Sequence, residues 1–133
     1  MSERSLVVLD ASVGVKWFKN EAGSVSARDL LGQHHQGQAL IVVPALFMAE
    51  VVAVATRHDL ALGHEVWSLL RDADLTVLSL DDAVAEAAFA QCGVLGCDFY
   101  DALAPALATL LGATLYSADA KAHARFPGVV LLG

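Results

Sequence analysis

Short apolar runs that are rich in branched residues alternate along the chain with longer segments in which apolar residues recur at helical spacing. Runs of this length suit strands that are buried on both faces, as in a parallel sheet. Five such runs predict strands over residues 5–9, 39–43, 75–78, 113–117 and 129–132. Strands that alternate with helices indicate an α/β fold with a mainly parallel, five-stranded sheet and helices on both of its faces. We therefore expect three layers.

The segments between the strands predict the helices. The first begins after Asp10 and ends near Phe18, and residues 93–96 form a turn. Pro44 suits the first position of the helix that extends to about residue 58, because that position does not need the missing N–H. The other helices are expected over residues 24–35, 62–73, 98–111, from 83 to about 92 and from 120 to about 125.

The composition favours one intracellular domain. A length of 133 residues predicts a single domain over residues 1–133 with one core. No apolar stretch reaches about 18 residues, and the first apolar run is too short for a signal peptide, so we expect no membrane segment and a cytoplasmic location. Two cysteines do not make a disulfide framework. Because 56% of the residues are hydrophobic, we also expect a partner or self-association.

The charge balance limits how the chain meets nucleic acid. With 15 acidic and 8 basic residues, the net charge is −7, which argues against a broad basic footprint for DNA or RNA. It does not exclude a nuclease, because a bound cation reverses the local field of an acidic site. We expect a local basic rim or a basic partner beside any such site.

Four carboxylates are predicted at one edge of the sheet. Asp10 and Asp119 each follow an apolar strand, Glu50 lies about two turns into the helix after the second strand, and Asp101 lies in the first turn of its helix. Ligands bind at the carboxyl ends of the strands in open α/β sheets. Carboxylates that converge there call for a hard cation such as Mg²⁺ or Mn²⁺, and the chemistry that follows is metal-assisted phosphodiester hydrolysis.

Each acid also has a purely structural interpretation. Asp10 and Asp119 are in position to cap the helices that follow them. Asp101 suits a first turn because the helix dipole favours an acid there. Glu50 is in position to pair with Arg57 on the surface. Lys16, Arg57 and His123 are interpreted as solvated surface residues rather than RNA contacts.

Four motifs resemble those of the PIN-domain ribonucleases, and in particular the VapC-like toxins of bacterial type II toxin–antitoxin pairs. The resemblance follows the chain in order over nearly its whole length, and the four motifs together are specific where one alone is not. The motifs are Leu9 to Phe18 followed by Glu21, Pro44 to Val51, Tyr100 to Ala104, and Leu115 to Asp119.

The resemblance implies a single PIN-like domain that acts as a Mg²⁺- or Mn²⁺-dependent endoribonuclease. Its acidic quartet of catalytic residues and metal ligands would be Asp10, Glu50, Asp101 and Asp119. It also implies a parallel five-stranded sheet, a homodimer, an RNA substrate and a cognate antitoxin that inhibits by covering the active site. Family substrates are usually structured RNAs, and they vary between members.

Two positions depart from the family pattern, and two hydroxyls accompany the acids. Pro105 stands where the family usually has a larger apolar residue, and a proline there cannot donate to the carbonyl of Asp101. Asp98 stands where Ser or Thr is common; it suits a helix N-cap, with a peripheral metal contact as the minor alternative. Ser12 and Ser117 are candidates for orienting the metal ligands.

Other functions are compatible with parts of this pattern. A catalytically silent PIN-like binding module is the main alternative, and Pro105 is the feature that favours it. A phosphatase with Asp10 as nucleophile is disfavoured, because the haloacid-dehalogenase type needs a second acid two residues on, where this chain has Ser12. A nucleotide site of the P-loop or Rossmann type is also disfavoured, since no glycine-rich phosphate loop follows any predicted strand.

Overall fold

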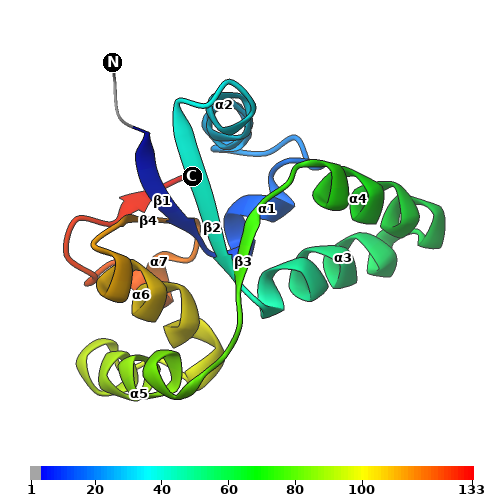
Figure 1. Ribbon diagram of the computed structural model, residues 1–133. Coiled ribbons are helices and arrows are strands. Elements are labelled where there is room, and N and C mark those ends of the chain that lie inside the picture. Colours follow the sequence, from blue (N-terminus) through cyan, green and yellow to red (C-terminus); the bar gives the residue numbers. More distant parts are fainter. Residues whose placement is uncertain (1–3) are drawn as a thin grey trace.

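The strands form one parallel sheet. Residues 4–133 are described in a computed structural model of the protein (Figure 1). The spatial order of the strands is β3-β2-β1-β4-β5, and every neighbouring pair is parallel. The predicted α/β class with a five-stranded parallel sheet is confirmed. The strands are β1 (Ser5–Leu9), β2 (Ala39–Pro44), β3 (Thr76–Leu78), β4 (Thr114–Ser117) and β5 (Val130–Leu131).

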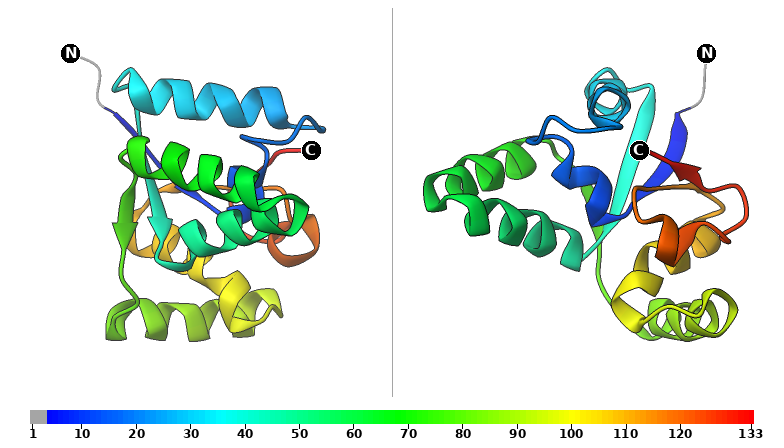
Figure 2. Two further views of the ribbon diagram at one scale, coloured as in Figure 1. Left: turned by 90° about the vertical axis from the view of Figure 1, so that its right-hand side faces the viewer. Right: turned by 180° about the vertical axis from the view of Figure 1, so that it is seen from behind.

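Helices cover both faces of the sheet, as predicted, which gives three layers (Figure 2). One buried apolar cluster joins the sheet to α1–α4, and a second joins its other face to α5 and α6. The helices are α1 (Ala11–Val15), α2 (Ser24–His35), α3 (Leu46–His58), α4 (Leu60–Asp72), α5 (Asp82–Leu95), α6 (Phe99–Leu111) and α7 (Ala120–His123).

The central strand β1 is buried on both faces, as its apolar run predicts. Val7 and Leu9 pack in the cluster under α1–α4, while Val8 between them packs in the cluster under α5 and α6. Side chains alternate across a strand, so a strand between two helical layers needs apolar residues at every position. The carboxylate of Asp10 follows at the point where this burial ends.

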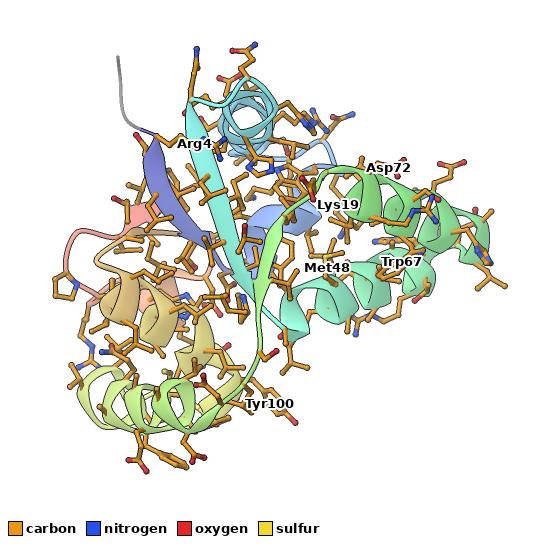
Figure 3. The ribbon with its side chains drawn as sticks, in the orientation of Figure 1. Arg4, Lys19, Met48, Trp67, Asp72 and Tyr100 are labelled. Atoms are coloured by element: carbon orange, nitrogen blue, oxygen red, sulfur yellow. The ribbon has the colours of Figure 1, made fainter. Side chains whose placement is uncertain are left out.

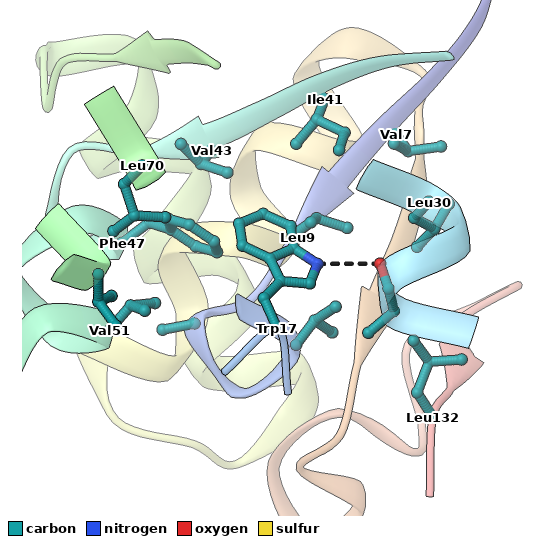
Figure 4. Packing of buried hydrophobic residues seen from close by; sticks show 14 of the residues in the cluster. Val7, Leu9, Trp17, Leu30, Ile41, Val43, Phe47, Val51, Leu70 and Leu132 are labelled. Carbon is teal, nitrogen blue, oxygen red and sulfur yellow. Dashed lines mark hydrogen bonds between the residues drawn. The ribbon is translucent and has the colours of Figure 1, made fainter. Parts of the chain in front are cut away.

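The packing of α1 against α3 brings the end of β1 close to the middle of α3. Trp17, just after α1, meets the ring of Phe47 on α3 edge to face at 5.8 Å, and its Nε1 donates to the carbonyl of Ala27 at 2.9 Å (Figure 4). A Cβ added at Gly14 would lie 2.6 Å from the Phe47 ring and 2.8 Å from Val51. Gly14 therefore permits this close approach, since a larger residue there would displace the side chains of Phe47 and Val51.

Two local predictions are wrong. Pro44 does not begin a helix: it is the last residue of β2, paired with Leu78, and α3 begins at Leu46. Its fixed φ is compatible with extended backbone. Residues 93–96 are not a turn, because α5 continues to Leu95 and ends at Gly96, whose φ of 67° gives the left-handed C-cap that glycine favours.

Apolar side chains remain on the outer surface of the helices. Trp67 on α4 and Tyr100 in the first turn of α6 are 46% and 66% exposed, and both are labelled in Figure 3. Within residues 4–133, no single helix has the length and apolar composition to cross a membrane. Only α5 and α6 taken together meet that test, and they are bent by 110° at their junction.

Candidate active site

Asp10 is held at the end of β1 by the helix that follows it. It is the N-cap of α1, and its Oδ2 accepts hydrogen bonds from the backbone N–H of Ser12 at 3.0 Å and from the Ser12 hydroxyl at 2.6 Å. The apolar strand stops where the chain turns into α1, and an aspartate satisfies the free N–H groups there. The capping interpretation of Asp10 is confirmed, and its Oδ1 accepts no hydrogen bond from residues 4–133.

Ser12 connects this strand end to the next one. Its Oγ also accepts the N–H of Ala118 at 2.9 Å, across 106 positions of sequence. Ala118 lies in the turn between β4 and α7, just before Asp119. Ser12 therefore fixes the Asp10 carboxylate and at the same time ties the ends of β1 and β4 together.

Asp119 is held in the same manner at the end of β4. It is the N-cap of α7, and its Oδ1 accepts the N–H of Ala122 at 3.1 Å. Its own N–H donates to the Oγ of Ser117 at 3.0 Å. Ser117 has no exposed surface, so the accepting end of this bond is shielded from water. The backbone that carries the Asp119 carboxylate is therefore fixed on both sides.

Asp101 projects from the first turn of α6. The helix begins at the N-cap Asp98, whose Oδ1 accepts the N–H of Asp101 at 2.8 Å, so the predicted cap is confirmed. Asp98 does not line the cavity described next; it lines a neighbouring one with Asp101 and Asp119. Capping uses the Asp98 carboxylate and leaves that of Asp101 free.

One cavity of about 440 Å³ lies at the carboxyl ends of the strands, and all four predicted acids line it. It is called the acidic cavity below. Glu50 lines it from the middle of α3, and Arg57 lines it from the last turn of the same helix. The lining residues are Asp10, Ala11, Ser12, Val15, Glu50, Ala53, Val54, Arg57, Asp101 and Asp119.

The carboxylates in the acidic cavity are close enough to repel one another. Desolvation raises the pKa of Glu50, and the charges of Asp10, Asp101 and Asp98 raise it further. Desolvation also raises the pKa of Asp101, with additions from Asp98, Asp119 and Asp10 that exceed the lowering effect of His123. The site therefore favours any species that supplies positive charge, either a proton or a cation.

The donor set of the acidic cavity fits a hard divalent cation. The four acids that line it would bind an ion through carboxylate oxygens, which Mg²⁺ and Mn²⁺ prefer. Among residues 4–133, no three His, Cys, Asp or Glu side chains are grouped so that they alone could hold a metal ion. Mg²⁺ is usually bound by one or two carboxylates plus waters and substrate phosphates, so an open group of acids is compatible with it.

Two residues predicted to be solvated are buried. Lys16 is 6% exposed and pairs with Glu21 at 3.2 Å. His123 is 0% exposed, and both of its ring nitrogens have partners, Ser117 Oγ at 2.7 Å and the Asp101 carbonyl at 2.6 Å. Sequence reasoning missed this contact, although Pro105 was a signal for it, because a proline leaves the Asp101 carbonyl without its helical donor.

Comparisons with known proteins point to one family. The PIN domain family matches residues 7–128 of the chain. A toxin–antitoxin complex from Klebsiella pneumoniae contains a similar structure, with a TM-score of 0.72, 19% identity, and coverage of 93% of this chain and 95% of that one. No curated protein matches the chain closely in sequence.

Two further solved structures are similar. VapBC2 from Rickettsia felis, bound to a DNA fragment from its promoter, has a TM-score of 0.69 at 15% identity, with 95% of this chain and 96% of that one covered. VapC20 from Mycobacterium tuberculosis, a Sarcin-Ricin loop cleaving toxin, has a TM-score of 0.69 at 16% identity, with 92% and 98% covered. The TM-scores show a common fold, and at identities this low the similarity shows the fold alone.

Proposed function

The chain belongs to the PIN domain family, and from that premise we propose that it is a divalent-metal-dependent endoribonuclease, the toxin of a toxin–antitoxin pair. The family match leaves only a few residues at either end, so we treat residues 1–133 as one PIN-like domain. The structurally similar proteins include toxin–antitoxin complexes and a toxin that cleaves the Sarcin-Ricin loop, which supports the same class of activity.

One observation carries the proposal: four carboxylates from four separate elements share the acidic cavity with a single arginine. A cavity with this charge repels the phosphates of RNA unless a cation is bound. Such a concentration of acids also costs stability, as the raised pKa values of Glu50 and Asp101 indicate. A cost of this kind is expected at a functional site rather than in a structural core.

Each residue has a specific role in this proposal. Asp10, Glu50, Asp101 and Asp119 hold Mg²⁺ or Mn²⁺, and a bound ion supplies the charge that stabilises a phosphodiester during hydrolysis. Ser12 and Ser117 fix the two strand-end acids. Arg57, at the rim of the same cavity, binds an RNA phosphate beside the scissile one, because a guanidinium matches phosphate geometry.

The proposed partners are a cognate antitoxin and a second copy of the chain. The exposed apolar side chains on α4 and α5, such as Leu60, Trp67, Phe89 and Val94, offer surface for both. A basic antitoxin segment would find charge-assisted hydrogen bonds in the acidic cavity. We place the protein in the cytoplasm with its RNA substrate. Co-purification with a small neighbour-encoded protein tests the first partner, and the mass in solution tests the dimer.

A silent PIN-like binding module is the alternative. The observation in its favour is that no three ligands among residues 4–133 form a ready metal site. The two functions differ in whether the chain must bind a divalent cation. The silent module predicts no divalent ion bound at millimolar concentration and no RNA cleavage at any concentration of Mn²⁺.

The decisive experiment induces the wild-type chain and Asp10→Asn in cells and sequences the RNA ends. We expect new ends at defined sites with the wild type only. The matched control is Glu86→Gln, which neutralises an exposed acid on α5 outside the acidic cavity and should cleave like the wild type. In vitro, cleavage that persists in saturating EDTA would contradict the metal-dependent mechanism.

A further inference from the structure

A proline inside α6 leaves one backbone carbonyl without its usual partner. In an α-helix the carbonyl of Asp101 would accept the N–H of residue 105, but Pro105 has none. The helix nevertheless continues unbroken from Phe99 to Leu111. Pro105 is fully buried, and Asp101, one turn before it, is half-buried. Backbone carbonyls in a folded chain are nearly always paired, so the actual donor to the Asp101 carbonyl matters.

His123 supplies that donor from another element. Its Nε2 lies 2.6 Å from the Asp101 carbonyl oxygen, and the side chain has no exposed surface. A carbonyl only accepts hydrogen bonds, so the ring proton must be on Nε2. His123 is the last residue of α7, the short helix that begins after Asp119. The first turn of α6 is therefore bonded to α7 as well as to its own helix.

The other ring nitrogen continues the connection. In a ring whose one proton is on Nε2, the Nδ1 is an acceptor, so the Ser117 hydroxyl, whose Oγ lies 2.7 Å away, is its donor. The Ser117 oxygen in turn accepts the N–H of Asp119 at 3.0 Å. An unbroken line of hydrogen bonds thus leads from the Asp119 backbone through Ser117 and His123 to the Asp101 backbone.

We propose that His123 and Ser117 are positioning residues that set Asp101 relative to Asp119, and that Pro105 and His123 form a matched pair. The proline removes the donor that would tie the Asp101 carbonyl to α6 alone, and the histidine replaces it with one from the element that carries Asp119. The role of this positioning in metal binding rests on the proposed function, whereas the pairing of Pro105 with His123 does not.

A double-mutant cycle tests the matched pair. His123→Phe keeps the size and shape of the ring but removes the donor, so it should shift the unfolding equilibrium about 5- to 150-fold toward the unfolded chain. In Pro105→Ala the helix regains an N–H for the Asp101 carbonyl. His123→Phe should then cost at least about fivefold less than it does beside Pro105.

A second histidine provides the control. His34 on α2 also has both ring nitrogens bonded to backbone, to the Ala73 carbonyl at 2.9 Å and the Ile41 N–H at 3.2 Å. His34→Phe should therefore destabilise the chain, but equally with Pro105 or Ala at position 105. The matched pair is overturned if the effects of His123→Phe and Pro105→Ala on the unfolding equilibrium are additive to within about twofold, as they should be for His34→Phe with Pro105→Ala.

The ring itself gives a spectroscopic readout that does not depend on activity. Nitrogen-15 spectra of the folded wild type should show the proton of His123 on Nε2, with slow exchange because the ring is buried. A proton on Nδ1, or a ring that averages rapidly between the two forms, would overturn the proposed hydrogen-bond line. The conservative variant His123→Gln keeps an amide donor near the Nε2 position and should recover most of the lost stability.

Mn²⁺ titration tests the positioning role. His123→Phe should raise the dissociation constant of Mn²⁺ about 10- to 100-fold, and His123→Gln should restore most of the lost affinity. Unchanged Mn²⁺ affinity in a folded His123→Phe protein would overturn the positioning role. A wild-type chain that binds no Mn²⁺ would instead overturn the proposed function, and the cycle at positions 105 and 123 would still decide whether the pair exists.

Discussion

The acidic cavity has two halves that differ in how their carboxylates are held. Asp10 and Asp119, the strand-end pair, each accept helix N-terminal N–H groups and are fixed by serines. Glu50 and Asp101, the helix-face pair, accept no hydrogen bond at their carboxylates from the part of the chain that the structure describes, and their pKa values are raised. The strand-end pair is already in place, whereas the helix-face pair needs a cation.

This difference explains why one fold can keep four acids together. Backbone N–H groups at helix starts stabilise the strand-end pair in the folded chain, with or without metal. No comparable group stabilises Glu50, which projects from the middle of α3. The helix-face pair therefore carries the electrostatic cost of the site, and ion binding is expected to relieve it.

The largest expected effect is on RNA cleavage and involves both halves. Asp119→Asn and Glu50→Gln should each reduce the rate about 10²- to 10³-fold, because both halves are needed to hold the ion and the phosphate charge. The control is Asp98→Asn, since asparagine caps a helix as well as aspartate does and should preserve activity. If Glu50→Gln retained wild-type cleavage, the helix-face pair would not belong to the site.

The next effect is stabilisation by the ion. Mn²⁺ at about 100 times its dissociation constant should raise the free energy of unfolding by about 2.7 kcal/mol. Glu50→Gln should lose most of that gain, because it removes a carboxylate from the half that lacks other partners. Chemical unfolding with and without Mn²⁺ measures both values. An equal gain in the variant would show that the ion binds elsewhere.

A smaller effect separates capping from catalysis in the strand-end pair. Asp10→Ala should lower the free energy of unfolding by about 1 kcal/mol, as expected for loss of an N-cap, and should also abolish cleavage. Asp59, the N-cap of α4, accepts the N–H of Ala61 and lies outside the acidic cavity. Asp59→Ala should lose similar stability but keep cleavage in assays below its melting temperature; equal loss of activity in both variants would count against a specific role for Asp10.

The smallest effect is a pH dependence of the helix-face pair. The folded chain binds protons at Glu50 and Asp101 more tightly than the unfolded chain does, so stability falls as pH rises through their raised pKa values. Without metal, Glu50→Gln should therefore be more stable than the wild type at pH 7, by less than about 1 kcal/mol, because water still reaches the partly desolvated Glu50 carboxylate and screens its charge.

This pH dependence has a clear direction to check. The gain in stability from Glu50→Gln should vanish below about pH 4, where the Glu50 carboxyl of the wild type is protonated and therefore also uncharged. Thermal unfolding across this range in EDTA measures it. A variant that is less stable than the wild type at neutral pH would mean that Glu50 has a favourable partner in the fold.

The sequence predicted the layers well because the signals were local. Each strand is an apolar run bounded by turn residues, and the burial of β1 on both faces follows from its continuous apolar run after Ser5. The positions of Asp10 and Asp119 followed from the same signal, because both come where a buried strand ends. Capping by Asp98 was equally readable, since it depends only on residues three positions apart.

The buried polar residues could not be predicted in the same way, because their partners are distant in sequence or lie in loops. His123 looked like a surface residue on a short polar helix, but its bond to Asp101 spans 22 positions. Lys16 looked solvated because its partner Glu21 lies beyond α1, in a loop with no periodic signal. Pro44 was misassigned since its fixed φ suits a helix start and a strand end alike.

Crystals grown with Mn²⁺ would test the central claim most directly, by anomalous diffraction at the manganese edge. The account predicts an anomalous peak inside the acidic cavity, within coordination distance of carboxylates from both the strand-end pair and the helix-face pair. A peak that contacted neither pair, or a fully occupied ion elsewhere on the chain with none in the cavity, would contradict it.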